Sequence, residues 1–159
     1  MSLVLRPARR EDVARILGFV RELAEYERLI HKVEATEAGL ADAMFGDRPL
    51  VFSTLAEWDG EAVGFTLWFY NFSTFHGRPG IFLEDLFVRP AFRGRGIARA
   101  LLAELAKRCI DEGLPRFEWM VLNWNEPAIA VYRRLGAEPM SDWTLQRVSG
   151  PALLKLAED

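Results

Sequence analysis

The chain has 159 residues, half of them hydrophobic, with a formal net charge of -3 and a sequence pI of about 5.5. This length and composition predict one globular domain spanning residues 1–159. The charge balance argues against the overall basic field that holds nucleic acid. The single cysteine, Cys109, forms no internal disulfide, and neither an N-terminal apolar run nor a membrane-spanning stretch is present. We therefore expect a cytoplasmic protein that binds neither nucleic acid nor membrane.

The first third of the chain predicts a short strand followed by two helices. Residues 3–7 alternate and end at a proline, which favours a strand that stops there. From Glu11 to about Leu29, apolar side chains recur with the spacing of a helix that has one buried stripe. Thr36 is expected to cap a second helix through about Phe45, because its side-chain oxygen accepts a free N–H of the first turn.

The middle of the chain predicts three strands. Residues 51–58 and 62–70 are rich in β-branched and aromatic side chains, and Asp59-Gly60 between them is a hairpin signal. Residues 71–80 are expected to form an aromatic loop. Residues 81–88 are the next strand, which ends before a proline.

The remainder predicts two further strands and three helical segments. An amphipathic helix covers residues 97–110 and stops at a following glycine. A strand is expected at 117–122 and a helix at 125–135, with a proline in its first turn. A last strand at 143–148 precedes a short terminal helix or turn at 151–156. The expected order is strand, helix, helix, three strands, helix, strand, helix, strand.

The joint between the strand 81–88 and the following helix is the most informative segment. It reads Arg93-Gly94-Arg95-Gly96-Ile97-Ala98, and its glycines allow a sharp turn at which amide N–H groups converge on an anion. A phosphate-bearing ligand is therefore expected. A dinucleotide-binding turn would need a glycine where Arg99 stands and a place near the first strand, and a nucleotide P-loop would need Gly-Lys-Ser/Thr. The joint has neither pattern.

Instead, the joint matches the pattern Arg/Gln-x-x-Gly-x-Gly/Ala, the pyrophosphate-binding turn of the GNAT acetyltransferases, and the chain resembles that family. A second signature of the family, an asparagine that opens a helix and a tyrosine seven residues later, fits Asn125 and Tyr132. Further blocks, in order along the chain, resemble the diamine (spermidine/spermine N1-) acetyltransferase branch: 22–27, 82–88, 124–127 and 132–137.

The resemblance implies acetyl-CoA as cosubstrate and an α/β (α+β) GNAT fold, with a mixed central sheet of about six to seven strands flanked by helices. Amide groups of the joint would bind the pyrophosphate, with arginine side chains adding charge-assisted bonds. The strand before the joint would pair with the pantetheine arm like an added strand. The expected cofactor-binding residues are Leu86, Phe87, Val88, Arg93, Gly94, Arg95, Gly96, Ile97, Ala98, Arg99, Asn125, Ala128 and Tyr132.

The resemblance also implies an acid and a base. It puts the Tyr132 hydroxyl beside the CoA sulfur, and a tyrosine with its ordinary pKa of about 10 is protonated at neutral pH and able to donate. Glu84 matches the glutamate that the branch uses as base, through water. On a regular strand Glu84 and Asp85 point to opposite faces, so only one of them faces the cleft directly. Cys109 lies on an apolar helix stripe with no histidine nearby in the sequence, so direct attack by the amine is favoured over a cysteine acyl-enzyme.

The two histidines do not indicate a metal site. His31 and His76 lie in predicted loops and lack metal-ligand spacing. We expect both on the surface and predict no metal.

The acceptor implied by the resemblance is a small cationic amine, which an acidic cleft would suit. Phe75 stands where the branch tends to have tryptophan, and residues 138–142 are shorter and less acidic than in the polyamine enzymes. A lysine-like amine therefore competes with spermidine. The substrate-binding residues expected from the resemblance are Tyr26, Glu27, Glu84, Asp85, Glu118, Trp119, Met120 and Asp142.

Three functions stay open at this point: a small-molecule amine N-acetyltransferase, a protein or peptide N-acetyltransferase on the same fold, and a CoA-binding module without catalysis. The aromatic loop at 71–80 favours a closed pocket over the open groove that a peptide needs. The presence of both Tyr132 and Glu84 disfavours the non-catalytic module. The apolar strands, together with the resemblance, also suggest a homodimer.

Overall fold

The computed structural model describes residues 2–159. By its internal contacts the chain divides into two compact units, one that ends at Leu122 and one that comprises Asn123–Asp159. No helix in the described part of the chain combines the length and the apolar character needed to cross a membrane.

The first unit is built on a five-stranded sheet in the order β1-β2-β3-β4-β5. The strands pair antiparallel except β4 and β5, which are parallel. This mixed sheet confirms the expected α/β class. The strands are β1 (Leu3–Pro7), β2 (Phe52–Trp58), β3 (Glu61–Ser73), β4 (Arg78–Val88) and β5 (Phe117–Trp119).

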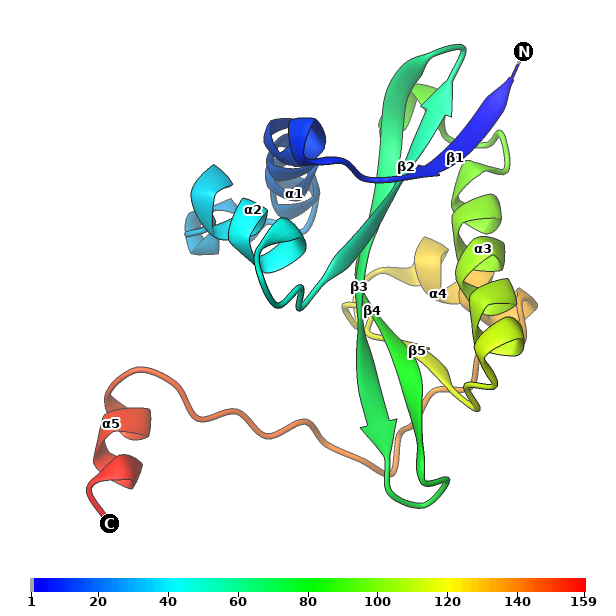
Figure 1. Cartoon of the computed structure of the whole chain (residues 1–159). Helices are drawn as coiled ribbons and strands as arrows, with labels where there is room; N and C mark the ends of the chain where they lie inside the picture. Colours follow the sequence, from blue (N-terminus) through cyan, green and yellow to red (C-terminus); the bar gives the residue numbers. More distant parts are fainter. Residues whose placement is uncertain (1) are drawn as a thin grey trace. The chain divides into compact units, whose positions relative to one another are not determined.

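Helices cover both faces of this sheet. Figure 1 shows α1 and α2 on one face and α3 on the other. Within the first unit the helices are α1 (Val13–Tyr26), α2 (Glu37–Phe45) and α3 (Ile97–Glu112), with short 3-10 turns at Arg10–Asp12, Ile30–Lys32 and Pro90–Phe92. The second unit contains α4 (Glu126–Arg134) and α5 (Pro151–Ala157).

Each face of the sheet has its own hydrophobic core. On the α1 face, the rings of Phe19 and Phe65 stack with centroids 5.5 Å apart. That core also contains Ile16, Met44, Leu55, Leu67 and Phe87. Under α3, the core residues are Ala56, Val63, Val88, Ile97 and Leu101. Because both faces are buried, the aromatic strands serve as internal layers.

The helix ends follow the predicted chemistry. The Gly39 N–H donates to the Thr36 side-chain oxygen at 3.1 Å, which confirms the cap of α2. Gly113 ends α3 with φ of 70°, the left-handed conformation that favours glycine. The predicted boundaries are correct where such local signals exist.

The predicted loop at 71–80 is wrong. Strands β3 and β4 continue into it, with Asn71 opposite Gly80 and Ser73 opposite Arg78, so only residues 74–77 turn. Cross-strand hydrogen bonds extend the hairpin through residues of low strand propensity. At its tip Phe75 is 92% exposed, which gives no support to a closed aromatic pocket built from this segment.

The predicted last strand at 143–148 is also wrong. The segment has no regular secondary structure and pairs with no strand of the described chain, and Trp143 is 73% exposed. Alternation of apolar and polar residues is not enough for a strand, which also needs a neighbouring edge for its backbone groups. The described sheet therefore has five strands rather than six to seven, and β5 has three residues rather than the six predicted.

Candidate active site

The pairing of β3 with β4 shifts by one residue at Glu84. Before the shift Leu83 lies opposite Trp68, and after it Asp85 lies opposite Leu67. Trp68 contacts α3, whereas Leu67 belongs to the core that faces α1. Opposed residues share a face, so Leu83 faces α3 and Asp85 faces α1, although they are two residues apart. The strict alternation assumed for this strand does not hold here.

This bulge brings three carboxyl groups into electrostatic contact. The pKa of Asp85 is raised to about 7, mainly by burial and then by the charges of Glu84 and Glu27. Burial also raises the pKa of Glu27, which follows the last residue of α1. None of the three forms an ion pair with the described residues. Unpaired acids at one place favour a cation, such as an ammonium group.

The part of β4 after the bulge has a free edge. β5 pairs with β4 only at Ile81–Leu83. Within the described chain, residues 84–88 therefore have a strand neighbour on the β3 side alone. An extended ligand that carries amide groups binds such an edge as an added strand. The expected main-chain contacts of residues 86–88 with a pantetheine arm are compatible with this edge.

The glycine joint forms a recess at the start of α3. Gly94 and Gly96 have φ of 78° and 80°, a region that other residues rarely adopt. No atom lies within 4 Å of where a Cβ would stand at either position, so the turn is open on that side. A cavity of about 130 Å³ lies here, lined by Val88, Phe92, Arg93, Gly94, Gly96, Ile97, Ala98 and Arg99. The unpaired N–H groups of the first helical turn and the open backbone fit a pyrophosphate.

The two arginine side chains of the joint already have protein partners. The Arg93 Nε–H donates to the Val88 carbonyl oxygen at 3.0 Å. The Arg93 guanidinium also lies 5.1 Å from the centroid of the Tyr26 ring. The Arg95 guanidinium lies 5.0 Å from the Trp58 ring and 5.1 Å from a second ring, that of the preceding 3-10 turn. No spacing rule in the sequence signals these contacts, because Tyr26 and Arg93 are far apart along the chain.

Other expected substrate residues occupy the β5 region. Glu118 accepts a hydrogen bond from Asn71 Nδ2 at 3.1 Å and lies 3.8 Å from the Arg116 guanidinium. Trp119 is half-buried, and Met120 is exposed. Glu118 thus supports the β3–β4 hairpin, and the substrate contacts of these residues stay predictions.

In the second unit, Asn125 begins α4. Its Oδ1 accepts a hydrogen bond from the Ala128 N–H at 3.4 Å. Tyr132 follows seven residues after Asn125, about two turns along, which places both on one side of the helix. Asp142 is exposed. The roles of these residues in the site also stay predictions.

The structure does not favour a nucleophilic cysteine. Cys109 is buried in α3, and its burial raises the pKa of the thiol, so the reactive thiolate is disfavoured. Both histidines are exposed, as predicted. Among residues 2–159, no group of three or more His, Cys, Asp or Glu side chains is placed to hold a metal ion.

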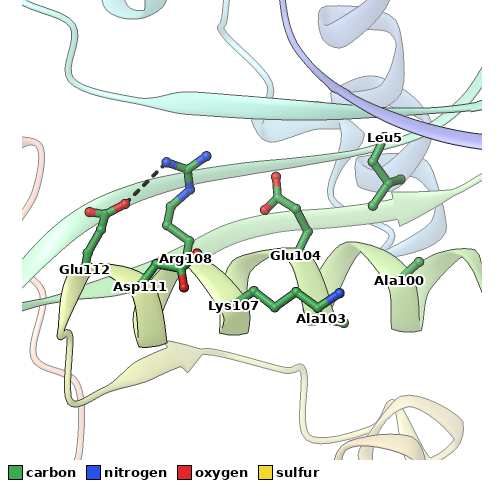
Figure 2. A pocket seen from close by; sticks show the side chains of 8 residues that line it. All are labelled: Leu5, Ala100, Ala103, Glu104, Lys107, Arg108, Asp111 and Glu112. Carbon is green, nitrogen blue, oxygen red and sulfur yellow. Dashed lines mark hydrogen bonds and ion pairs between the residues drawn. The ribbon is translucent and has the colours of Figure 1, made fainter.

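A larger cavity, of about 510 Å³, lies elsewhere, along α3 and beside Leu5 of β1 (Figure 2). Three of its charged residues, Glu104, Arg108 and Glu112, are engaged with one another or with the sheet. Arg108 pairs with Glu112 at 3.3 Å, and the Thr54 hydroxyl donates to Glu104 at 2.8 Å. This groove carries both signs of charge and presents no nucleophile beside a base. The bulge, the free edge and the glycine joint are therefore the better candidate site.

The chain is similar to known acetyltransferases over almost its whole length. Residues 12–137 match the model of the Acetyltransferase (GNAT) family. A thialysine N-epsilon-acetyltransferase of Sus scrofa is 36% identical over 98% of both chains. An L-ornithine N5-acetyltransferase of Arabidopsis thaliana is 29% identical over 94% of this chain and 85% of its own. The solved structure of an integron cassette protein from the mobile metagenome of V. cholerae superposes with a TM-score of 0.83 at 25% identity, covering 100% and 99% of the two chains.

Proposed function

Since the chain belongs to the GNAT acetyltransferase family and is an acetyl-CoA-dependent N-acetyltransferase, we propose that its acceptor is the primary amine of a small cationic molecule. Lysine-like amines, diamines and polyamines form this class, as the names thialysine and ornithine acetyltransferase of the relatives suggest. The supporting observation is the free edge of β4, which has the carboxyls of Glu84 and Asp85 at one end and the glycine joint after the other.

The proposed binding mode follows this edge. The cosubstrate supplies a thioester carbonyl and, after transfer, a thiolate leaving group. Amide groups of residues 94–99 hold its pyrophosphate, and the edge of residues 86–88 holds its pantetheine arm. Asn125 and Ala128 are proposed to line the same arm. We further propose that both units act as one acetyltransferase domain, and the family match at 12–137, which crosses their boundary, supports this.

The proposed chemistry is direct attack by the amine. Asp85 and Glu27 hold the ammonium, whose positive charge compensates their buried carboxylates. Glu84, which is exposed, accepts a proton from the ammonium through water. The neutral nitrogen then attacks the thioester carbonyl, the C–S bond breaks, and the Tyr132 hydroxyl gives a proton to the departing thiolate. The new amide nitrogen loses its extra proton, which restores the Tyr132 hydroxyl. Tyr26, Trp119 and the other expected contacts would shape the pocket around the amine.

The test is release of CoA thiol from acetyl-CoA in the presence of thialysine, ornithine and spermidine. Turnover is expected with at least one amine. Tyr132→Phe should lower kcat at least 10²-fold, the low end of general acid catalysis, while leaving the Kd for acetyl-CoA nearly unchanged. Tyr70→Phe is the matched control, because the Tyr70 hydroxyl donates to Glu112 at 2.7 Å, on the α3 face. Equal turnover in the two variants would exclude Tyr132 as the acid.

The same assay separates the alternatives. Labelling of a peptide array by an enzyme that ignores every amine would identify a protein or peptide N-acetyltransferase. Tight CoA binding with no acceptor of either kind would identify a binding module.

We also propose that two copies associate. The apolar strands that suggested this are mostly internal, since Val63 and Phe65 are fully buried. The C-terminal segment instead exposes large apolar side chains, among them Trp143, Leu145 and Leu154. Light scattering should give twice the chain mass of 18.1 kDa.

A further inference from the structure

We propose that Arg93 is a positioning residue, which couples the amine side of the site to the acetyl-CoA side by joining the end of α1 to the glycine joint. This inference rests on the proposed function for the identity of the two ligands. The Arg93 side chain links three segments: the last residue of α1, the end of β4 and the joint itself.

The contacts of Arg93 are directional. Its Nε–H donates to the Val88 carbonyl at 3.0 Å, which ties the joint to the end of the free edge. Its guanidinium carbon lies over two rings, 5.1 Å from the centroid of Tyr26 and 5.8 Å from that of Phe87. A planar guanidinium satisfies both requirements at once, because it donates in its plane and stacks with its face.

The joint needs such a restraint because its glycines are permissive. Gly94 and Gly96 have open space where a side chain would stand, so neither packing nor side-chain sterics fix the turn there. If the turn becomes ordered only when ligand binds, the entropy cost of ordering it weakens the affinity for the ligand. A turn that is already held in place does not carry this cost. Arg93 therefore prepares the amide groups for the pyrophosphate, and Tyr26 contributes to this although it is expected to serve the amine.

Arg95 restrains the other side of the joint and provides a matched control. Its guanidinium carbon lies 5.0 Å from the centroid of the Trp58 ring and 5.1 Å from that of the Phe92 ring. Removing either guanidinium loosens the joint and removes one positive charge. Of these two arginines only Arg93 contacts α1, so only Arg93→Met removes the guanidinium contact of Tyr26.

The experiment is a double-mutant cycle read by the Kd for acetyl-CoA, measured by calorimetry without amine. Tyr26→Leu should weaken binding roughly two- to fivefold, the range of one exposed cation–π contact, and Tyr26→Phe should not, because it keeps the ring. In an Arg93→Met background the Tyr26→Leu effect should vanish. In an Arg95→Met background it should persist in full. An unchanged Kd in Tyr26→Leu, or equal effects in both backgrounds, would overturn the coupling.

Amide hydrogen exchange of residues 93–98 without any ligand provides a readout that does not depend on catalysis. Tyr26→Leu should speed this exchange relative to Tyr26→Phe, while Arg93→Met abolishes the difference between the two. If wild-type protein failed to release CoA with every acceptor, the proposed function would be wrong, yet exchange would still decide whether Arg93 restrains the joint. If turnover is normal and exchange is insensitive to Tyr26, the inference alone is wrong.

Discussion

Replacing Asp85 by Asn should make the stability of the protein less dependent on pH. In the folded protein the pKa of this carboxyl is about 7, against an ordinary value of 3.8, because the side chain is partly buried and lies near two other acids. Below pH 4 Asp85 is protonated in both the folded and the unfolded chain, so it does not lower the free energy of unfolding. As the pH rises from about 4 to 7, the unfolded chain releases the proton first, so the free energy of unfolding falls; above pH 7 the loss is complete.

The size of this loss follows from the two pKa values. The gap between 3.8 and about 7 corresponds to about 4 kcal/mol, at about 1.4 kcal/mol for each pH unit. The amide of Asp85→Asn has nearly the same shape and no titration. Its stability relative to the wild type should therefore rise by about 4 kcal/mol between pH 4 and pH 8.5, whatever constant offset the substitution adds.

Urea unfolding at a series of pH values measures this difference. Asp47→Asn is the control for the chemistry of the substitution, because Asp47 is exposed and its replacement should change the free energy of unfolding little. A difference for Asp85→Asn that does not change with pH would show that Asp85 is solvated and would refute the electrostatic account of the bulge.

Three further predictions concern the same elements. Gly64→Ala should destabilise the protein by about 1–3 kcal/mol in urea unfolding, because its Cβ would lie 2.7 Å from the Phe87 carbonyl oxygen. Gly18→Ala, with open space inside α1, should stabilise it by about 0.5–1 kcal/mol, and a reversed sign in either variant would contradict the prediction for that glycine. Thr36→Ala should cost about 1 kcal/mol by loss of the cap of α2, and Thr36→Ser should restore most of it. The KM for the amine should rise up to about tenfold for each pH unit below 7, because Asp85 must lose its proton to pair with the ammonium; a KM constant from pH 5 to 7 would remove Asp85 from the amine site.

The features that the sequence predicts correctly depend on local chemistry. The hydroxyl of Thr36 and the left-handed glycine at 113 act within one helical turn, so neighbouring residues suffice to recognise them. The glycine joint is also local, and its motif identified the family. Equally local patterns failed where the outcome depends on distant partners. Residues 71–80 form a hairpin because their two halves pair, and residues 143–148 lack the edge that a strand requires.

The candidate site was predictable as a set of residues but not as an arrangement. The family motifs selected Glu84, Asp85 and Arg93. They did not reveal that Asp85 is turned toward α1 or that Arg93 stacks on Tyr26, because both depend on tertiary packing between segments remote in sequence. The roles of Asn125 and Tyr132 still rest on the resemblance.

The bulge accommodates Glu84 as an extra residue in the middle of β4. It therefore predicts that the strand can lose this residue and keep its other side chains on their present faces. Without Glu84, strict alternation would place Leu83 on the α3 face, Asp85 on the α1 face and Phe87 on the α1 face, which are the faces that they occupy now.

Deleting Glu84 should therefore leave a protein that unfolds cooperatively but does not transfer acetyl groups. Deleting Leu86 from the same strand should move Phe87 out of its core and abolish cooperative unfolding, because a one-residue slip exchanges the two faces of a strand. Circular dichroism melting of both variants tests this. If the two deletions were equally damaging, Glu84 would not be the inserted residue, and the placement of Asp85 beside Glu27 would need another cause.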